Sequence, residues 1–289
     1  MAKAAGAKKT FRVVAEELGF TEGPVWTHDG SLLVTSISHG LIYELDGKGG
    51  HSVYAKTTGG PNGMTEGLDG SLYVTQNGGI FGTNSTSDTR TDPGIQHIVD
   101  GEVRHIAKGL DAPNDLCFGP DDRLYFTDPR GWARPQDLPP GRVYSMEVNG
   151  EPELLTEGPA FTNGIAFGLH ASPLYVAETF GKRVLVYPLR DGKLGKAEEF
   201  CKIDPGMPDG MCFDENGLLY VAATVAQEIQ VFDAKGERID RLPCGKDSLI
   251  TNCCFGGSDG KTLFATDSRQ ERVIAFDLDV AGLALYPFR

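Results

Sequence analysis

The chain has 289 residues, with 27 basic and 40 acidic side chains and a formal net charge of −13. This charge argues against a nucleic acid partner, which would require a basic face, and against binding to anionic membrane surfaces. The chain has no run of 18 apolar residues, which is the length that a membrane-spanning helix needs. The first 20 residues also lack the apolar core of a secretory signal.

The chain opens with a segment that carries lysines but little apolar bulk, so we expect residues 1–10 to form a disordered tail. A first strand is expected at 11–16 (FRVVAE), ahead of a series of repeats. All-β rings often exceed the usual domain size, so we expect residues 11–289 to form one domain.

Six similar segments then follow one another along the chain. They read TEGPVW, GPNGMTEG, APNDLCFG, FTNGIAFG, MPDGMCFD and ITNCCFGG, and their polar heads are Glu22, Asn62, Asn114, Asn163, Asp209 and Thr251. The heads are 40 to 52 residues apart, which is typical of the repeated unit of a propeller or a solenoid. Four residues after each head comes a large aromatic side chain, except at Glu66.

Each repeat continues with runs rich in Val, Leu, Ile, Tyr and Phe, separated by turns such as HDG (28–30) and SDG (258–260). These runs predict strands joined by hairpins, and no sustained helical periodicity is present. A fourth run, such as SVYA (52–55), completes each unit. We therefore predict an all-β, six-bladed β-propeller with four-stranded blades. The strand at 11–16 is expected to close the ring on the last blade, with the tail at 283–289 as its rival.

Two of the loops expected on the same face as the heads are long. They run from Asn77 to Gly94 and from Asp128 to Gly141. Long loops without structure of their own are often functional, so we expect them to cover a site, with a tolerated surface insertion as the alternative. Trp132, flanked by Arg130 and Arg134, is a candidate wall for a ring-shaped or acyl substrate.

Equivalent positions of a closed ring converge on one axis, so the heads would form an oxygen cage for a cation. Glu22, Asn163 and Asp209 supply oxygen ligands, and no histidine stands at any head, which argues against a histidine-type zinc site. Such ligands suit Ca²⁺, Mg²⁺ or Mn²⁺, with Zn²⁺ and Fe²⁺ in a mixed set. The alternative is that the polar heads only hydrate a water-filled channel.

The six cysteines include no C-x-x-C pair. Cys117, Cys212 and Cys254 stand at the same position of three repeats, where we expect them to act as small buried apolar residues. Reduced thiols in a cytoplasmic protein are therefore expected rather than a disulfide scaffold.

The motifs TEGPVW, PND with the later YFTDP, TNGIAF, PDGM and TNCCFGG, in this order, resemble the regucalcin/gluconolactonase family, also called senescence-marker-protein lactonases. The bacterial gluconolactonase-like branch is the closer one. The resemblance implies a propeller that binds one divalent cation, with Ca²⁺ preferred, through Glu22, Asn163 and Asp209. It also implies hydrolysis of a lactone (a cyclic ester), with Asp209 as the catalytic proton-handling residue.

Asn62, Asn114 and Trp132 are the candidate substrate-binding residues. The resemblance implies that Asn114 contacts the metal directly or through substrate or water. The animal branch carries an arginine two residues before this position, which helps to hold a sugar lactone, whereas Ala112 stands here. This departure leaves the identity of the lactone open.

None of the six heads is a serine or a cysteine, the usual covalent nucleophiles of ester hydrolysis. The heads therefore offer no covalent nucleophile of this kind. Metal-assisted attack by water is therefore the expected mechanism, in which the ion polarises the carbonyl and acidifies a bound water. Two alternatives stay open. A phosphotriesterase-like hydrolase would act on organophosphates but on no lactone, and a non-catalytic, metal-stabilised binding propeller would lose stability on chelation without hydrolysing anything.

Overall fold

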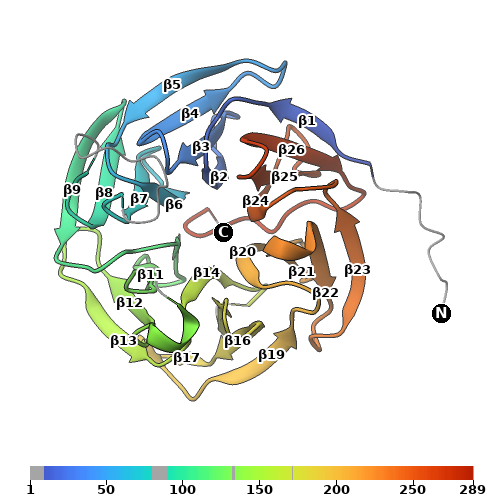
Figure 1. The fold of residues 1–289 in the computed structure, drawn as a ribbon. Coiled ribbons are helices and arrows are strands. Elements are labelled where there is room, and N and C mark those ends of the chain that lie inside the picture. Colours follow the sequence, from blue (N-terminus) through green and yellow to red (C-terminus); the bar gives the residue numbers. More distant parts are fainter. Residues whose placement is uncertain (1–9, 80–89, 132–133, 171, 289) are drawn as a thin grey trace.

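The computed structural model describes residues 10–79, 90–131, 134–170 and 172–288. In these residues the chain forms six four-stranded antiparallel sheets around a central axis, as Figure 1 shows. The prediction of an all-β, six-bladed propeller is therefore confirmed. No helix in the described ranges is long and apolar enough to cross a membrane.

The first three blades follow one another directly along the chain. Blade 1 consists of β2 (Thr21–Trp26), β3 (Leu32–Ser36), β4 (Leu41–Leu45) and β5 (His51–Lys56). Blade 2 consists of β6 (Pro61–Glu66), β7 (Leu72–Gln76), β8 (Gly94–Val99) and β9 (Glu102–Lys108). Blade 3 consists of β10 (Leu116–Phe118), β11 (Leu124–Asp128), β12 (Arg142–Met146) and β13 (Glu153–Glu157), with a short 3₁₀ helix, η2 (Pro135–Asp137), between β11 and β12.

The other three blades add small insertions to the same plan. Blade 4 consists of β14 (Thr162–Phe167), β15 (Leu174–Glu178), β16 (Arg183–Tyr187) and β19 (Glu198–Lys202), with a hairpin of β17 (Leu189–Arg190) and β18 (Lys193–Leu194) before β19. Blade 5 consists of β20 (Pro208–Phe213), β21 (Leu219–Ala223), β22 (Glu228–Phe232) and β23 (Arg238–Pro243), with η3 (Thr224–Ala226) after β21. Blade 6 consists of β24 (Ile250–Gly256), β25 (Thr262–Asp267), β26 (Arg272–Asp277) and β1 (Arg12–Ala15).

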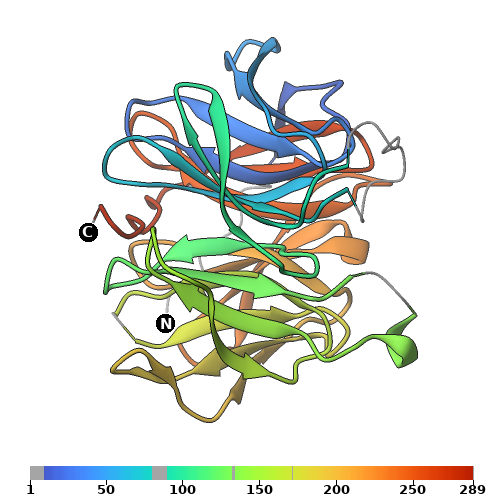
Figure 2. The same cartoon turned by 90° about the vertical axis from the view of Figure 1, so that its left-hand side faces the viewer.

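The N-terminal strand closes the ring, as the sequence predicts. β1 pairs antiparallel with β26, with Arg12 opposite Ala275. The C-terminal segment, which was the alternative candidate for closing the ring, takes a different course. Leu283 donates its backbone N–H to the carbonyl of Phe213 at 2.9 Å, at the far end of inner strand β20. In Figure 2 the C-terminus leaves the ring on the face opposite the loop that carries η2.

An apolar cluster fills each interface between neighbouring blades. Between blades 1 and 2, for example, Ile42 and Val74 are fully buried together with Ile98. Each blade is covered on both faces by its neighbours, which explains why its middle strands are apolar on both faces. Truncating one such side chain to alanine would cost about 2–5 kcal/mol of folding free energy. This packing holds the starts of the inner strands at fixed places around the axis.

Candidate functional site

The inner strands of all six blades begin on one face of the ring, which we call the mouth. Glu22 in β2, Asn163 in β14 and Asp209 in β20 occupy equivalent places near the start of their strands. Glu22 and Asn163 are 3% and 4% exposed, whereas Asp209 is partly exposed. Asp115 directly precedes β10 and is also buried. We call Glu22, Asp115 and Asp209 the axial acids.

One oxygen of Glu22 is held by the protein and the other is not. Oε2 accepts hydrogen bonds from the Gly23 N–H at 2.9 Å and from Nδ2 of Asn252 at 3.0 Å. Among the described residues, no hydrogen bond goes to Oε1. Burial raises the pKa of Glu22 to about 7, and the charge of Asp115 acts in the same direction.

Asp209 is held in a similar way by the preceding blade. Burial raises the pKa of Asp209 well above its usual value, and the charges of Glu22 and Asp115 raise it further. Hydrogen bonds from the Asn163 side chain and from the Gly210 N–H oppose this rise. The three acids are therefore close enough to repel one another, and each gains part of its stabilisation from N–H donors.

A threonine fixes the orientation of the Asn163 amide. Nδ2 of Asn163 donates to Oγ1 of Thr179 at 3.1 Å, and the same hydroxyl donates to the carbonyl of Pro208 at 2.9 Å. The hydroxyl proton is thus engaged by Pro208, so Oγ1 can only accept from Asn163. This arrangement assigns nitrogen to the Thr179 side of the amide and leaves its oxygen available to another partner.

Asp115 is an axial acid that the repeat pattern does not single out, because the head of its segment is Asn114. Its Oδ1 accepts the Leu116 N–H at 2.9 Å, and burial raises the pKa of Asp115 to about 7. Gly63 of the neighbouring blade makes room for it, since a Cβ at position 63 would collide with Oδ1. The sequence feature that could have identified Asp115 is the residue that follows each head. This residue is glycine in four repeats, but it is Asp115 and Asn252 in the other two.

The remaining heads differ in how far the fold uses their side chains. Oδ1 of Asn62 is buried and has no hydrogen-bond partner among the described residues. Asn114 is 6% exposed, and its carbonyl accepts the Gly63 N–H at 2.7 Å. Oγ1 of Thr251 donates to the carbonyl of Thr21 at 2.9 Å, so this head joins blade 6 to blade 1. Trp132 lies outside the described residues.

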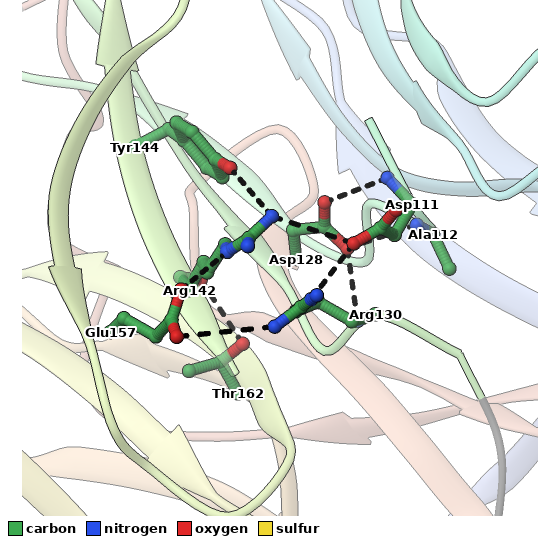
Figure 3. Close-up of polar contacts among 8 residues, drawn as sticks. All are labelled: Asp111, Ala112, Asp128, Arg130, Arg142, Tyr144, Glu157 and Thr162. Atoms are coloured by element: carbon green, nitrogen blue, oxygen red, sulfur yellow. Dashed lines mark hydrogen bonds and ion pairs between the residues drawn. The ribbon is translucent and has the colours of Figure 1, made fainter. Parts of the chain in front are cut away.

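The segment before Asn114 is anchored by Asp128, as Figure 3 shows. Asp128 is fully buried at the end of β11, and its oxygens accept the backbone N–H groups of Asp111 at 3.0 Å and Ala112 at 2.9 Å. It also accepts the N–H of Arg130 at 3.0 Å. Because this carboxylate is occupied by three backbone donors, its role is to fix the loops around Asn114.

Two arginines at the mouth join these loops to the outer strand of blade 3 (Figure 3). Nε of Arg130 lies 2.8 Å from Oδ2 of Asp111, and Nε of Arg142 lies 2.7 Å from Oε2 of Glu157. Arg142 also lies 3.4 Å from Asp111, so the four charges form a balanced cluster. The cluster braces the rim next to Asn114, where the sequence has Ala112.

A cavity of about 370 Å³ lies behind the axial acids, on the side away from the mouth. Asp115 and Asn252 lie at one end of it, and the C-terminal segment from Leu283 to Phe288 lines it. Its wall includes the aromatic residues four positions after the heads, namely Trp26, Phe118, Phe167, Phe213 and Phe255. The axial acids therefore separate a polar mouth from an apolar rear chamber.

In the described part of the chain, no group of three or more His, Cys, Asp or Glu side chains is arranged to hold a metal ion. A cation at the mouth would therefore need amide oxygens besides carboxylates. The Asn163 amide meets that need geometrically, because its oxygen is the end that Thr179 leaves available.

Comparisons with known proteins agree with the fold and with the motifs. Residues 20–269 match the model of the SMP-30/gluconolactonase/LRE-like region. The chain is 27% identical over 290 positions to a gluconolactonase of Zymomonas mobilis, covering 89% of this chain and 78% of that protein. It is 27% identical over 263 positions to the pentonolactonase XacC of Haloferax volcanii, covering 88% and 84%.

A solved structure of a calcium-binding regucalcin from Agrobacterium tumefaciens superposes with a TM-score of 0.80, covering 97% of this chain and 98% of that one. At 20% identity this likeness shows the fold alone. The family model, by contrast, covers most of the chain. The chain therefore belongs to the SMP-30/gluconolactonase family.

Proposed function

We propose that the protein is a divalent-metal-dependent lactonase that opens a cyclic ester by attack of water at the mouth. The observation that carries the proposal is the gathering of the axial acids, Glu22, Asp115 and Asp209, in a buried place, where the charge of Asp115 raises the pKa of Glu22 and the charges of both raise the pKa of Asp209. Without a positive partner this arrangement is unfavourable for folding. Family membership and the lactonase names of two relatives supply the reaction class.

The residues present fit a hard divalent cation. Glu22 offers Oε1, which has no protein donor in the described ranges, and Asn163 offers its amide oxygen opposite Thr179. Asp209 adds a second carboxylate, so a divalent ion would be formally neutralised. Oδ1 of Asn62, another head, is a further buried oxygen that has no hydrogen-bond partner in the described part of the chain. Oxygen-only donors of this kind favour Ca²⁺, with Mg²⁺, Mn²⁺, Zn²⁺ and Fe²⁺ as alternatives.

Glu22, Asn163 and Asp209 would hold this ion. Once bound, a divalent cation polarises an ester carbonyl and lowers the pKa of water. The name of the Agrobacterium regucalcin, a calcium-binding protein, agrees with Ca²⁺ as the first ion to test.

Asp209 is the proposed general base. It is partly exposed, whereas Glu22 and Asp115 are buried, so it is the axial acid best placed to reach substrate from the mouth. A carboxylate oxygen of Asp209 takes the proton of the attacking water as the new C–O bond forms at the carbonyl carbon. The ring C–O bond then breaks and the proton passes to the departing alkoxide, which gives the open hydroxy acid.

Asn62 and Asn114 are the proposed substrate-orienting residues. Oδ1 of Asn62 can accept a hydrogen bond from a substrate hydroxyl without losing a protein partner, because it has none among the described residues. The Asn114 backbone is fixed by the anchored segment beside Asp128, so its amide is presented at a constant place. We keep Trp132 as a proposed apolar wall of the same site.

The test is a panel of sugar, aliphatic and aromatic lactones in a pH-indicator assay, with an organophosphate triester included. Protein stripped by a chelator is reloaded with each candidate ion, and the uncatalysed rate is subtracted. We expect acid release from at least one lactone class in the presence of Ca²⁺. Hydrolysis of the triester alone, or of nothing with any ion, would contradict the proposal.

A further inference from the structure

Asn252 in β24 stands out because every polar group of its side chain is engaged. Its Oδ1 accepts the N–H of Cys253 at 2.8 Å, which leaves Nδ2 as the end that faces the axis. Nδ2 donates to Oε2 of Glu22 at 3.0 Å. Asn252 is 7% exposed, and its backbone N–H donates to Oγ1 of Thr266 at 2.8 Å. The amide therefore cannot turn without losing hydrogen bonds.

The neighbouring blade is shaped to admit this amide. A Cβ at Gly210 would collide with Oδ1 of Asn252, so glycine at 210 is what allows the side chain to lie across the start of β20. The same amide stabilises the carboxylates of two axial acids, since its hydrogen bonding opposes the rise in pKa of both Glu22 and Asp115. Asn252 thus joins two carboxylates that would otherwise repel each other.

We propose that Asn252 is a positioning residue for Glu22: it holds Oε2 from the rear so that Oε1 is directed at the place of the cation. This inference rests on the proposed function and adds a residue outside the expected ligand set. Hydrogen-bond partners of a metal ligand fix its orientation, and their loss typically weakens metal binding by about 10–100-fold. Asn252 touches neither substrate nor the reacting atoms in this scheme.

The test is calorimetric titration of Ca²⁺ into chelator-stripped, full-length protein. Asn252→Ala should raise the Kd by about 10–100-fold relative to wild type, while Asn216→Ala, at an exposed turn, should leave it unchanged. Turnover of Asn252→Ala at saturating Ca²⁺ should return to within about threefold of wild type, because the ion then occupies the site. A purely structural defect would lower turnover at every Ca²⁺ concentration.

Asn252→Asp provides a second variant of the same shape, in case the alanine variant does not fold. Its carboxylate places an oxygen where Nδ2 faces Glu22, so we expect weaker Ca²⁺ binding here too. Equal affinity in wild type and both variants would overturn the inference, and tighter binding by Asn252→Asp would show that residue 252 ligates the ion itself. Wild-type protein that binds no divalent ion would instead overturn the proposed function, and this inference with it.

Discussion

Replacing Glu22 by glutamine should stabilise the metal-free protein at alkaline pH. The pKa of Glu22 rises from 4.5 to about 7 in the folded chain, chiefly through burial. A shift of this size corresponds to roughly 3 kcal/mol, at 1.36 kcal/mol for each pH unit. The glutamine carbonyl can still accept the hydrogen bonds of Gly23 and Asn252, so the substitution removes the charge and keeps the contacts.

The pH dependence follows from the direction of the shift. An acid with a higher pKa in the folded chain gives that chain more bound protons, so stability falls as pH rises from about 4.5 to about 7. The free energy of unfolding of Glu22→Gln should therefore exceed that of wild type by about 3 kcal/mol at pH 8 and by less than about 1 kcal/mol at pH 5. In a domain of this size, the difference at pH 8 corresponds to roughly 5 °C in Tm.

The assay is thermal unfolding with a chelator present at both pH values. Glu198→Gln in β19, at an exposed position, removes the same formal charge and should show no such difference. With Ca²⁺ added, wild type should gain more stability than Glu22→Gln, because the variant offers the ion one charge fewer. Equal Tm values of wild type and Glu22→Gln at pH 8 with chelator would refute the reasoning about a buried, uncompensated charge.

Four other substitutions probe the site. Asp209→Asn should lower kcat by about 10²–10⁴-fold at saturating metal, because an amide cannot take the proton. Asn114→Ala should lower kcat less. Near-native turnover of Asp209→Asn would show that Asp209 is only a ligand. Thr179→Val removes one of the two hydrogen bonds that hold the amide of Asn163, the other being to Asp209. It should weaken Ca²⁺ binding about tenfold in calorimetry, and unchanged affinity would contradict the assigned orientation. Gly210→Ala should lower both Tm and Ca²⁺ affinity, unlike Gly195→Ala, because only the former collides with Asn252; equal behaviour of the two alanine variants would count against that collision.

The fold could be predicted because each repeat is specified by residues that are close together in the sequence. Polar heads such as Glu22 and Asn163, the apolar runs after them and the Asp-Gly turns specify strands and hairpins locally. Ring closure by β1 also follows, because the run at 11–16 has no place in the first repeat and the last repeat lacks a strand. These features need no knowledge of which residues meet across the axis.

The neighbours of the heads could not be predicted in the same way. Asp115 and Asn252 stand where the other repeats have glycine, so the position suggests a backbone requirement rather than chemistry. Their roles depend on Gly63 and Gly210, which lie on different strands and leave room for their side chains. The course of the C-terminal segment into the rear chamber likewise depends on contacts with Phe213, far away in sequence.

We propose above that lactone hydrolysis at the mouth depends on one divalent ion. The most direct measurement is the initial rate of lactone hydrolysis by chelator-stripped protein titrated with Ca²⁺, with bound ion counted in the same samples. We predict that stripped protein is inactive and that the rate rises in proportion to occupancy, up to one ion per chain bound through Glu22, Asn163 and Asp209. Full hydrolytic activity in stripped protein, with no ion bound, would contradict the account.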